Sequence, residues 1–427
     1  VLSKGDYIFM EEINQNSQTS LDFKVDKFEP KDESEIQQIV RYCFKKNLPI
    51  EIVGSQTKRN IGKQLQCAKT LDMSKYSGII DYKPEELYIT VKAGTPLKVI
   101  QDELKKNNQH LAFEPINFSE IFKTNLNEGT IGGTLSCNFS GSRRFKVGSA
   151  RDHILGFKGF NGKGEKIKSG GTVVKNVTGY DLSKLITGSF GTLLVLSEIT
   201  MKVLPLESYS KTIIVSGLSL EHGLAIMNSA IATSNDPSGA IFYPANLRNN
   251  FIYNDLVHPG SITAIRVEGT KISTNQRINN LLEELVLGDK KLTILDNTQS
   301  EIFWEDSRNL KVFSKKDTNL IRAVVPPSST LNLINRLKTF HPNYFIDWGG
   351  SLLWMELDYL SSQKIDQLRR RILETEGYMT VIKSKASVKS SSEIFTIDPI
   401  KFKISQNIKK SFDPKRILNP GKMYTGI

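Results

Sequence analysis

The first hydrophobic pattern of the chain is an apolar stripe with helical spacing. Asp32 and Glu35 have the capping-box spacing that opens a helix, and a run of Asn47-Leu48-Pro49 closes it. The apolar positions that share one face are Ile36, Ile39, Val40 and Cys43. A short apolar run, Ile50–Val53, comes next and leads directly into the polar loop Gly54-Ser55-Gln56-Thr57-Lys58. The pattern predicts a helix, then a buried strand that ends in a polar loop.

A second strand and a second helix follow in the same order. The alternation of Leu87, Ile89 and Val91 predicts the strand. Thr95 and Pro96 are the residue types of an N-cap and a first helical position, so we expect the next helix to begin there. Its buried face should consist of Leu97, Ile100 and Leu104.

Glycine, serine and threonine are concentrated between Gly129 and Pro205, although the chain has only 30 glycines in 427 residues. The block predicts a short helix from Gly132-Gly133 to about Asn138 and a hairpin around residues 161–164. A helix over 181–187 and a strand over 192–203 complete it. Because glycine has no Cβ, such loops let backbone N–H groups approach a large anionic ligand.

Beyond Leu206 the pattern changes to strands that alternate with longer helices, such as strands 211–215 and 261–267 and helices 221–232 and 274–287. This predicts an α+β arrangement and a second domain. A last helix over 404–412 precedes a proline- and glycine-containing tail. We therefore expect three parts: a cofactor-binding domain over residues 1–205, an α+β domain over 206–400, and a tail over 401–427 that returns to the first domain.

Composition and charge narrow the class of protein. Hydrophobic residues make up 39% and charged residues 24%, as in globular proteins. No apolar run approaches the ~20 residues that cross a bilayer, and we expect neither a signal peptide nor a transmembrane segment. The net charge is +12, but the positive residues are scattered among acidic ones, so we expect no nucleic-acid partner. Cys43, Cys67 and Cys137 have no metal-ligand spacing and are expected to be buried, unpaired thiols.

The two polar loops are not nucleotide-binding motifs of the common kinds. The chain contains no GxxxxGK[ST] sequence, and no GxGxxG sequence lies between a strand and its helix. Two loops in one unit, one after Val53 and one at Gly132-Gly133, predict an extended dinucleotide held between two subdomains.

Several longer motifs resemble one flavoprotein family. They are KAGTPL (92–97), TIGG (130–133), KNVTGYDL (175–182), TGSFGT (187–192), EITMKVLP (198–205), IDWGG (346–350) and NPGKM (419–423). In this order they resemble the family of vanillyl-alcohol oxidase and p-cresol methylhydroxylase (PCMH), and within it the FAD-binding subunits of bacterial glycolate oxidases. The resemblance is dense over about 32–205 and sparse in the C-terminal half.

The resemblance implies a two-subdomain PCMH-type FAD-binding fold topped by an α+β substrate-cap domain. The loop Gly54, Ser55, Gln56, Thr57 and Lys58 should hold the pyrophosphate, with Lys58 adding positive charge; otherwise Lys58 is an exposed loop lysine. The other residues implied for FAD are Gly132, Gly133, Ser136, Asn138, Ile199 and Asn419. For Ile199 an ordinary core position is an equal alternative, and for Asn419 a rigid turn. The pyrophosphate loop contains neither histidine nor cysteine, so we expect non-covalent FAD.

Flavin chemistry on a 2-hydroxy acid needs a cation for the carboxylate and a base for the hydroxyl proton. Arg143 and Arg144 are the candidates for the carboxylate because they follow the predicted FAD-binding helix directly; the alternative is a solvent-facing or phosphate-binding pair. Asp347 in the IDWGG segment is a further catalytic candidate, and its alternative is the end of a cap strand. His222, His258 and His341 are widely spaced, so we expect no metal site.

Three functions remain open from the sequence. The first is an FAD-binding subunit of a glycolate oxidase (dehydrogenase) complex, which oxidises glycolate to glyoxylate with a larger flavoprotein subunit and an iron–sulfur subunit. The second is a self-sufficient FAD oxidoreductase for D-lactate or another 2-hydroxy acid. The third is a non-catalytic FAD subunit that relays electrons. The expected compartment is the cytoplasm, or the inner face of the membrane where partners hold the chain there.

Overall fold

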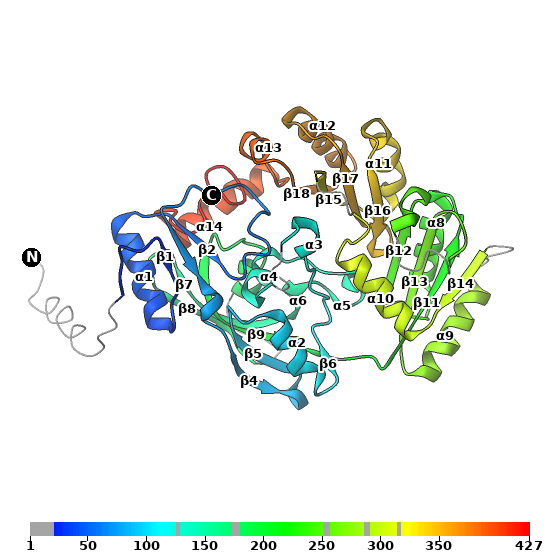
Figure 1. Cartoon of the computed structure of the whole chain (residues 1–427), viewed down its shortest axis with the longest axis horizontal. Helices are drawn as coiled ribbons and strands as arrows, with labels where there is room; N and C mark the ends of the chain where they lie inside the picture. The colour runs from blue at the N-terminus through cyan, green and yellow to red at the C-terminus, as the bar shows by residue number, and fades with distance from the viewer. Residues whose placement is uncertain (1–20, 125–128, 173–179, 251–256, 286–290, 314–316) are drawn as a thin grey trace, which may run out of the picture.

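The computed structural model describes residues 21–124, 129–172, 180–250, 257–285, 291–313 and 317–427. Figure 1 shows that an N-terminal half with two sheets lies beside a C-terminal half with one large sheet. The mixture of helices and sheets confirms the predicted α+β class. The sequence motif KNVTGYDL falls largely on residues 173–179, which lie outside the described ranges.

The N-terminal half begins with a small parallel sheet of order β1-β3-β2. Helix α1 lies between β1 and β2 in the chain. The elements of this part are β1 (Lys27–Phe28), α1 (Glu33–Lys46), β2 (Ile50–Val53) and β3 (Lys69–Asp72). Asp32 caps α1 by accepting from the N–H of Glu35, and the helix buries the predicted stripe of Ile36, Ile39, Val40 and Cys43. The first helix and strand are therefore confirmed.

The second sheet of this half is antiparallel and has the order β4-β5-β9-β7-β8. Its strands are β4 (Ile79–Lys83), β5 (Tyr88–Lys92), β7 (Ile154–Asn161), β8 (Lys166–Gly170) and β9 (Leu194–Lys202). The helices of this part are α2 (Leu97–Lys105), α3 (Ser119–Phe122), α4 (Ile131–Cys137), α5 (Arg144–Val147), α6 (Ala150–His153) and α7 (Leu182–Ile186). A two-stranded pair, β6 (Gln109–His110) and β10 (Leu204–Pro205), leads toward the other half.

The predicted start of α2 is wrong by one residue. The N-cap is Pro96, without a side-chain cap, and Thr95 stands before it. The Thr95 hydroxyl donates to the carbonyl of Lys92 at 2.7 Å and lies 2.9 Å from the Gly78 nitrogen, whose N–H donates to it. The side chain that would cap the helix is thus used to join two strand ends.

The C-terminal half is built on eight antiparallel strands of order β14-β11-β13-β12-β16-β17-β15-β18. They are β11 (Tyr209–Ser216), β12 (Gly239–Tyr243), β13 (Ile262–Gly269), β14 (Lys291–Leu295), β15 (Asn319–Val324), β16 (Asn343–Asp347), β17 (Leu352–Leu357) and β18 (Tyr378–Lys383). The helices are α8 (Leu220–Ala232), α9 (Lys271–Glu284), α10 (Asn297–Arg308), α11 (Thr330–Leu337), α12 (Ser362–Leu373) and α13 (Ala386–Ser391). All strands of this sheet come from residues after Leu206, where we place the boundary of the second domain as a prediction.

The two faces of the large sheet have different neighbours. Phe242 of β12 faces Gly223 of α8, whereas Gly239 on the same strand faces Trp304 of α10. Side chains three positions apart on a strand point to opposite faces, so α8 and α10 cover opposite sides. By strand register, the face of Gly239 also carries Arg266, Glu268, Asp347 and Arg322. We call it the inner face, and several of its charged residues meet the N-terminal half.

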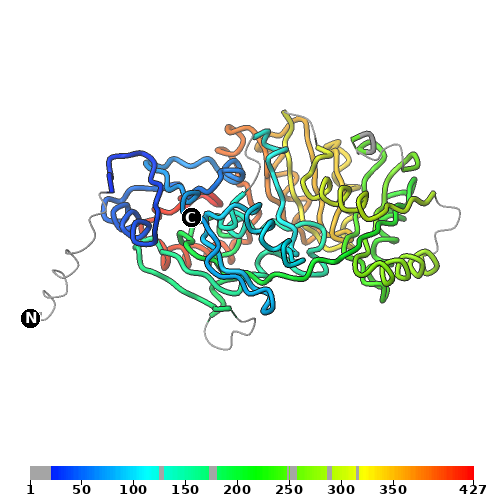
Figure 2. Tube along the Cα trace, turned by 60° about the horizontal axis from the view of Figure 1, so that its bottom comes forward, coloured from blue at the N-terminus to red at the C-terminus, as the bar shows by residue number. Residues whose placement is uncertain are grey.

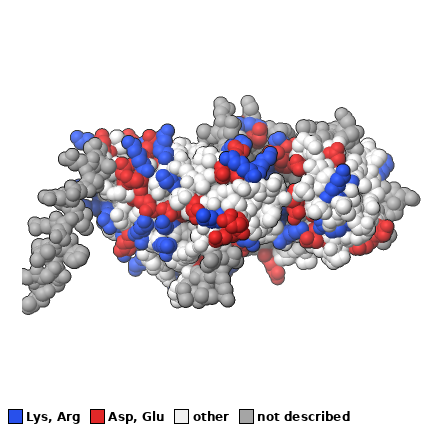
Figure 3. Space-filling view, turned by 90° about the horizontal axis from the view of Figure 1, so that it is seen from below, with Lys and Arg blue, Asp and Glu red and all other residues white. Residues whose placement is uncertain are grey.

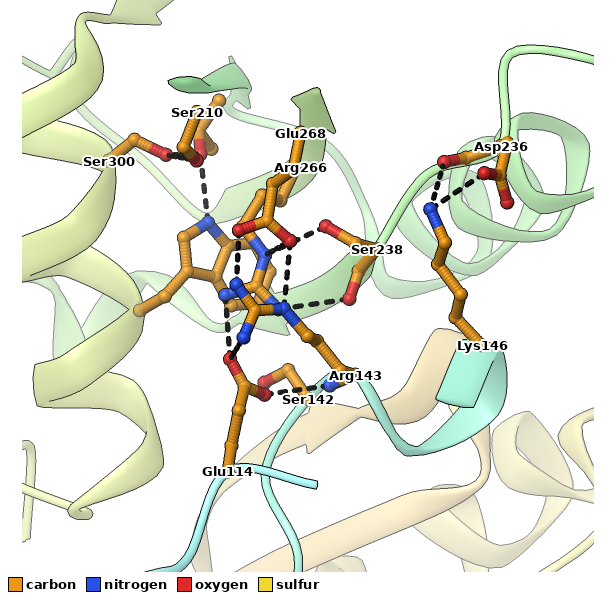
Figure 4. A network of polar contacts seen from close by, with 12 residues as sticks. Glu114, Ser142, Arg143, Lys146, Ser210, Asp236, Ser238, Arg266, Glu268 and Ser300 are labelled. Carbon is orange, nitrogen blue, oxygen red and sulfur yellow. Dashed lines mark hydrogen bonds and ion pairs between the residues drawn. The ribbon is translucent and has the colours of Figure 1, made fainter. Parts of the chain in front are cut away.

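A buried cluster of four charges joins the two halves (Figure 4). Arg143 of the N-terminal half donates from Nε to Glu268 Oε2 at 2.9 Å, and its Nη2 reaches the other oxygen of this carboxylate. Arg266 donates from Nη1 to Glu114 Oε1 at 2.9 Å. Each half therefore supplies one acid and one arginine to the cluster, and the pairs Arg143–Glu268 and Arg266–Glu114 cross from one half to the other.

Electrostatics inside the cluster favour the charged forms. Burial by itself would raise the pKa of Glu114, but the charges of Arg266 and Arg143 outweigh it and hold the pKa at about 2. The pKa of Glu268 is lowered for the same reason, since burial opposes and the two arginines prevail. Because two cations face two anions, the buried charge is balanced.

The C-terminal tail packs against the start of the chain, as the red and blue segments show in Figures 1 and 2. Helix α14 (Pro399–Phe412) begins five residues before the predicted start, where Asp398 caps it. Lys409 is 1% exposed and donates to Asp413 at 2.8 Å and to the carbonyls of Thr192 and Leu418. Leu418 then lies in parallel beside Ile50 of β2.

We predict that Arg266→Met lowers the free energy of unfolding by about 3–5 kcal/mol, because it leaves two buried carboxylates with one cation. Chemical unfolding at pH 7 measures the change. Arg336→Met is the matched control, since Arg336 pairs with Glu374 at the surface and exposed pairs contribute little. Equal destabilisation by both variants would contradict the role given to the cluster.

Candidate functional site

A pocket opens between the small sheet, helix α4 and the C-terminal tail, and encloses about 820 Å³ of space that is partly open to solvent. Of the predicted cofactor residues, those that line it are Gly54, Ser55, Gln56, Thr57, Lys58, Gly132, Gly133, Ser136 and Asn419. Both polar loops of the sequence thus meet at one cavity. The apolar wall includes Phe190, Leu194 and Leu196.

The loop after β2 contains backbone N–H groups that can donate to a ligand. The N–H groups of residues 54–58 donate to no partner within the part of the chain that the structure describes. Thr57 and Lys58 are buried, and buried backbone donors in proteins are nearly always paired. A run of successive N–H groups also forms a site for anions. The loop therefore fits a ligand with phosphate oxygens.

Glycine is required at position 54 by a close approach. A Cβ added there would lie 2.3 Å from Thr130 Oγ1. Thr130 is the N-cap of α4 and its hydroxyl accepts from the N–H of Gly133. The loop is thus pressed against the start of the glycine-rich helix, which brings the two polar segments to one ligand.

Lys58 is a buried cation at the pocket and not the exposed loop lysine of the alternative interpretation. It is 9% exposed, and within the described part of the chain its Nζ has one hydrogen bond, a long one of 3.5 Å to Thr134 Oγ1. Burial lowers the pKa of this lysine. An ammonium group without a carboxylate among the described residues is suited to a bound anion.

Lys422 is a second lysine of the pocket, and the sequence analysis missed it. It is 7% exposed, and its Nζ donates to the carbonyl of Arg59 at 2.7 Å. Burial lowers its pKa. The residue is part of the NPGKM motif, but only the return of the tail to β2 shows that its side chain reaches the pocket.

Asn419 holds three segments together at the edge of the pocket. Its Oδ1 accepts from the N–H of Ile52 at 2.7 Å, and its Nδ2 donates to the carbonyl of Phe190 at 2.8 Å. A Cβ at Gly191 would lie 2.7 Å from that Nδ2. The rigid turn and the position beside the cavity, given as alternatives for Asn419, are therefore both present.

Two predicted cofactor residues lie away from the pocket lining. Asn138 ends α4 in a left-handed conformation, and its Oδ1 accepts from the N–H of Arg151. Ile199 is fully buried in the hydrophobic core around β9. The structure does not bring these two to the cavity, and their contact with the cofactor stays a prediction.

The three catalytic candidates lie at the inner face of the large sheet and not in the pocket lining. Arg143 is paired with Glu268 and Glu114, whereas Arg144 lies against the ring of Trp348, with Cζ 4.6 Å from its centroid. Asp347 accepts from Ser142 Oγ at 2.7 Å and from the N–H of Trp348. Burial raises the pKa of Asp347 to about 7, against the effect of these hydrogen bonds.

Comparison with known proteins identifies the family. Residues 27–170 match a protein family described as "FAD binding domain". Glycolate oxidase subunit GlcE of Escherichia coli K12 is 30% identical over 390 residues, which cover 91% of this chain and 96% of the relative. The chain belongs to this PCMH-type FAD-binding family. The sequence resemblance to glycolate oxidase FAD-binding subunits is therefore confirmed.

Other members of the family match over similar lengths. Glycolate oxidase subunit GlcD of Bacillus subtilis is 24% identical over 92% of this chain and 88% of its own length. A D-lactate dehydrogenase of Anaerostipes hadrus is 23% identical over 91% of this chain and 87% of its own length. Among solved structures, 4-ethylphenol oxidase from Gulosibacter chungangensis superposes with a TM-score of 0.67 at 13% identity, covering 93% of this chain and 88% of that chain. The last likeness confirms the fold.

FAD is the cofactor of this family member, and the pocket fits it. The unpaired N–H groups of residues 54–58 and the buried ammonium of Lys58 suit its pyrophosphate. The apolar wall at Phe190 and Leu194 suits an aromatic ring system. As an FAD-binding protein of this family, the chain is an oxidoreductase.

Two further observations concern groups outside the pocket. Among the described residues, no three histidine, cysteine, aspartate or glutamate side chains are grouped so as to hold a metal ion. No helix within the described ranges has the length and apolar character needed to cross a membrane. Cys43 is buried, whereas Cys67 and Cys137 are half-buried, which corrects the expectation of three buried thiols.

We predict that Lys58→Met weakens FAD binding by about 10- to 100-fold, because a charge-assisted contact with a phosphate is lost. Fluorescence titration of the apoprotein with FAD measures the dissociation constant. Lys63→Met is the matched control, since Lys63 is also largely buried but pairs with Glu393. The role of Lys58 is contradicted if both variants bind FAD as the wild type does.

We predict that Asp347→Asn is more stable than the wild type at pH 8, and that the difference shrinks by about 4 kcal/mol toward pH 4. The folded pKa of about 7 exceeds the unfolded value of 3.8. Ionisation therefore favours the unfolded state progressively between these values, and the neutral amide removes this cost. Urea unfolding at several pH values provides the test, and parallel curves for the two proteins would refute it.

Proposed function

We propose that the chain is the FAD-binding subunit of a glycolate oxidase (dehydrogenase) complex that converts glycolate to glyoxylate. The observation that carries this proposal is the 30% identity to glycolate oxidase subunit GlcE along nearly the whole of both chains. The cofactor pocket supports it, since the unpaired N–H groups and the buried lysine remain where FAD phosphates would lie. The predicted compartment is the cytoplasm or the inner face of the membrane.

Oxidation of glycolate to glyoxylate removes two electrons and two protons. Bound FAD would accept the two electrons together with the hydrogen of the α-carbon. The residues of this chain would hold the acid and take the hydroxyl proton. We assign the carboxylate to Arg144, which has no ion pair with a described carboxylate, in preference to Arg143, whose guanidinium is already shared by two acids.

Asp347 is the proposed acceptor of the hydroxyl proton. A general base works best when its pKa is near the working pH, and burial brings the pKa of Asp347 to about 7. Ser142 and the backbone of Trp348 fix the orientation of the carboxyl group through hydrogen bonds of 2.7 and 2.6 Å.

We propose that FAD is held non-covalently. Cys137 is the cysteine that lines the pocket, and burial raises the pKa of its thiol to about 11, against the charges of Lys58 and Lys422. A thiol at neutral pH is a poor nucleophile. The loop of residues 54–58 contains neither cysteine nor histidine.

The proposed partners are a larger flavoprotein subunit and an iron–sulfur subunit. Iron–sulfur clusters are generally held by four cysteine thiolates, and this chain has three cysteines, at widely separated positions. The GlcD relative is named as a subunit of the same kind of enzyme. Electrons would therefore leave this chain through a partner, a quinone or oxygen, and in the proposed complex the iron–sulfur subunit is that partner.

A second candidate is a self-sufficient oxidoreductase for D-lactate or another 2-hydroxy acid. It is favoured by the D-lactate dehydrogenase relative, which matches 91% of this chain. The third possibility from the sequence, a subunit that only relays electrons, predicts that Arg144 and Asp347 can be replaced without loss of activity in the complex.

We expect glycolate, in the absence of oxygen, to reduce the FAD of the isolated chain once, because Arg144, Asp347 and the FAD all belong to this chain. Repeated turnover should begin only when the partner subunits are added to accept the electrons. The flavin absorbance near its visible maximum gives the readout. Rapid reduction of the isolated chain by D-lactate would favour the second candidate, a self-sufficient oxidoreductase, over the glycolate oxidase subunit. If a complex that carries Arg144→Gln and Asp347→Asn oxidises glycolate as fast as the wild type, the chain has the third function and only relays electrons.

A further inference from the structure

Arg322 is a buried arginine in the middle of β15 that the sequence analysis did not single out. It is 7% exposed and stands on the inner face of the large sheet, opposite Trp354 of β17. Its guanidinium carbon lies 5.0 Å from the ring centroid of Trp348 and 5.7 Å from that of Phe139. Phe139 in turn contacts Phe190, which lines the FAD pocket, with ring centroids 6.4 Å apart. The residue thus lies behind the aromatic wall of that pocket.

Arg322 has no carboxylate partner among the described residues, unlike the other buried arginines of this face. Arg143 and Arg266 share two glutamates. Glu356, on the neighbouring strand, accepts instead from Thr318 Oγ1 at 2.7 Å. A buried charge without a counter-ion costs several kcal/mol. Aromatic rings offset part of this cost through cation–π contacts, and the Tyr378 hydroxyl accepts a hydrogen bond from the guanidinium, but a guanidinium has five N–H donors in all.

Arg144 is a second cation without an ion pair at the same indole ring. Its Cζ lies 4.6 Å from the Trp348 centroid, and it is half-buried. Asp152 interacts with Arg144 through its charge, and its carboxylate accepts hydrogen bonds from Ser149. Two guanidinium groups therefore meet at Trp348, one from each half of the molecule.

The charges act on one another across this ring. Burial lowers the pKa of Arg322 to about 10, Tyr378 opposes the change, and the charge of Arg144 adds to it. The repulsion between neighbouring like charges is reduced when an anion binds near both of them. Arginine is the side chain best suited to grip both oxygens of a carboxylate.

We propose that Arg322 and Arg144, together at Trp348, form a binding site for the carboxylate of a small organic acid. This proposal rests on the proposed function, because it takes the acid to be the 2-hydroxy acid that the chain oxidises. The site draws one cation from each half, so the buried ion cluster that joins the halves also sets the distance between the two arginines. Arg322 is thereby a carboxylate-binding residue on the cap sheet.

The experiment uses the FAD-loaded full chain and titrates it with oxalate, an acid that resembles glycolate but has no α-hydrogen, by isothermal titration calorimetry. We expect the wild type to bind oxalate and Arg322→Met to bind it at least about 100-fold more weakly, the size of effect seen when a buried charge contact is truncated. Arg144→Gln should weaken binding by about 10-fold, since its guanidinium is less buried.

Thermal unfolding of the same proteins separates a binding role from a structural one. Arg322→Met should keep or raise the melting temperature, because it removes a buried cation that no carboxylate neutralises. Arg266→Met is the matched comparison: it also removes a buried inner-face arginine, but it should lower the melting temperature. A structural role for Arg322 would show the reverse, a lower melting temperature with unchanged oxalate affinity in the folded protein.

Two outcomes overturn the proposal: no heat of oxalate binding by the wild type at millimolar concentration, or equal affinity in the wild type and Arg322→Met. Failure of the proposed function gives a different result. If oxalate binding depends on Arg322 but the complex does not oxidise glycolate, the carboxylate site stands and the substrate assignment falls.

Discussion

The arrangement of the two halves depends on a buried cluster of two arginines and two glutamates. Arg143 and Glu114 come from the N-terminal half, and Arg266 and Glu268 from alternate positions of one strand in the large sheet. Ion pairs form within each half, between Arg143 and Glu114 and between Arg266 and Glu268, but the hydrogen-bonded pairs Arg143–Glu268 and Arg266–Glu114 join one half to the other. The cost of burying four charges is met only in one relative position of the halves. The cluster thereby fixes where the inner face of the sheet lies against the FAD-binding half. On the face drawn in Figure 3, by contrast, basic and acidic side chains are interspersed.

The FAD pocket follows from a second long-range contact, the return of the C-terminal tail to β2. Asn419 binds the backbone of Ile52 and of Phe190, and Lys422 closes the wall beside Lys58. These contacts use the tail to hold the strand end in place, while the loop after it keeps its N–H groups for a ligand. The pocket is thus assembled from segments that are far apart in the chain, including residues 51–59, 130–137, 190–196 and 419–422.

Sequence analysis identified most of the elements and most of the pocket. The stripe from Ile36 to Cys43, the strand Ile50–Val53 and the polar loop after it are set by neighbours within a few residues, so local patterns were sufficient. Thr95 failed as a cap because its hydroxyl is used by Lys92 and Gly78. Lys422 and Arg322 gave no signal of their own, since a single lysine or arginine on a strand or turn is usually exposed.

Hydrophobic periodicity and glycine-rich loops are local properties of the chain, and they were enough to define the α+β class and the loops that meet at the cofactor. The FAD-binding family followed from the resemblance of longer motifs such as TGSFGT and NPGKM. Which charged groups are paired became apparent only from the folded molecule. Arg143 and Arg144 are adjacent in sequence, but one is held by two glutamates and the other lies on an indole. The reason is that the strength of an ion pair depends on burial and on partners that are distant along the chain, and these exist only once the two halves have come together.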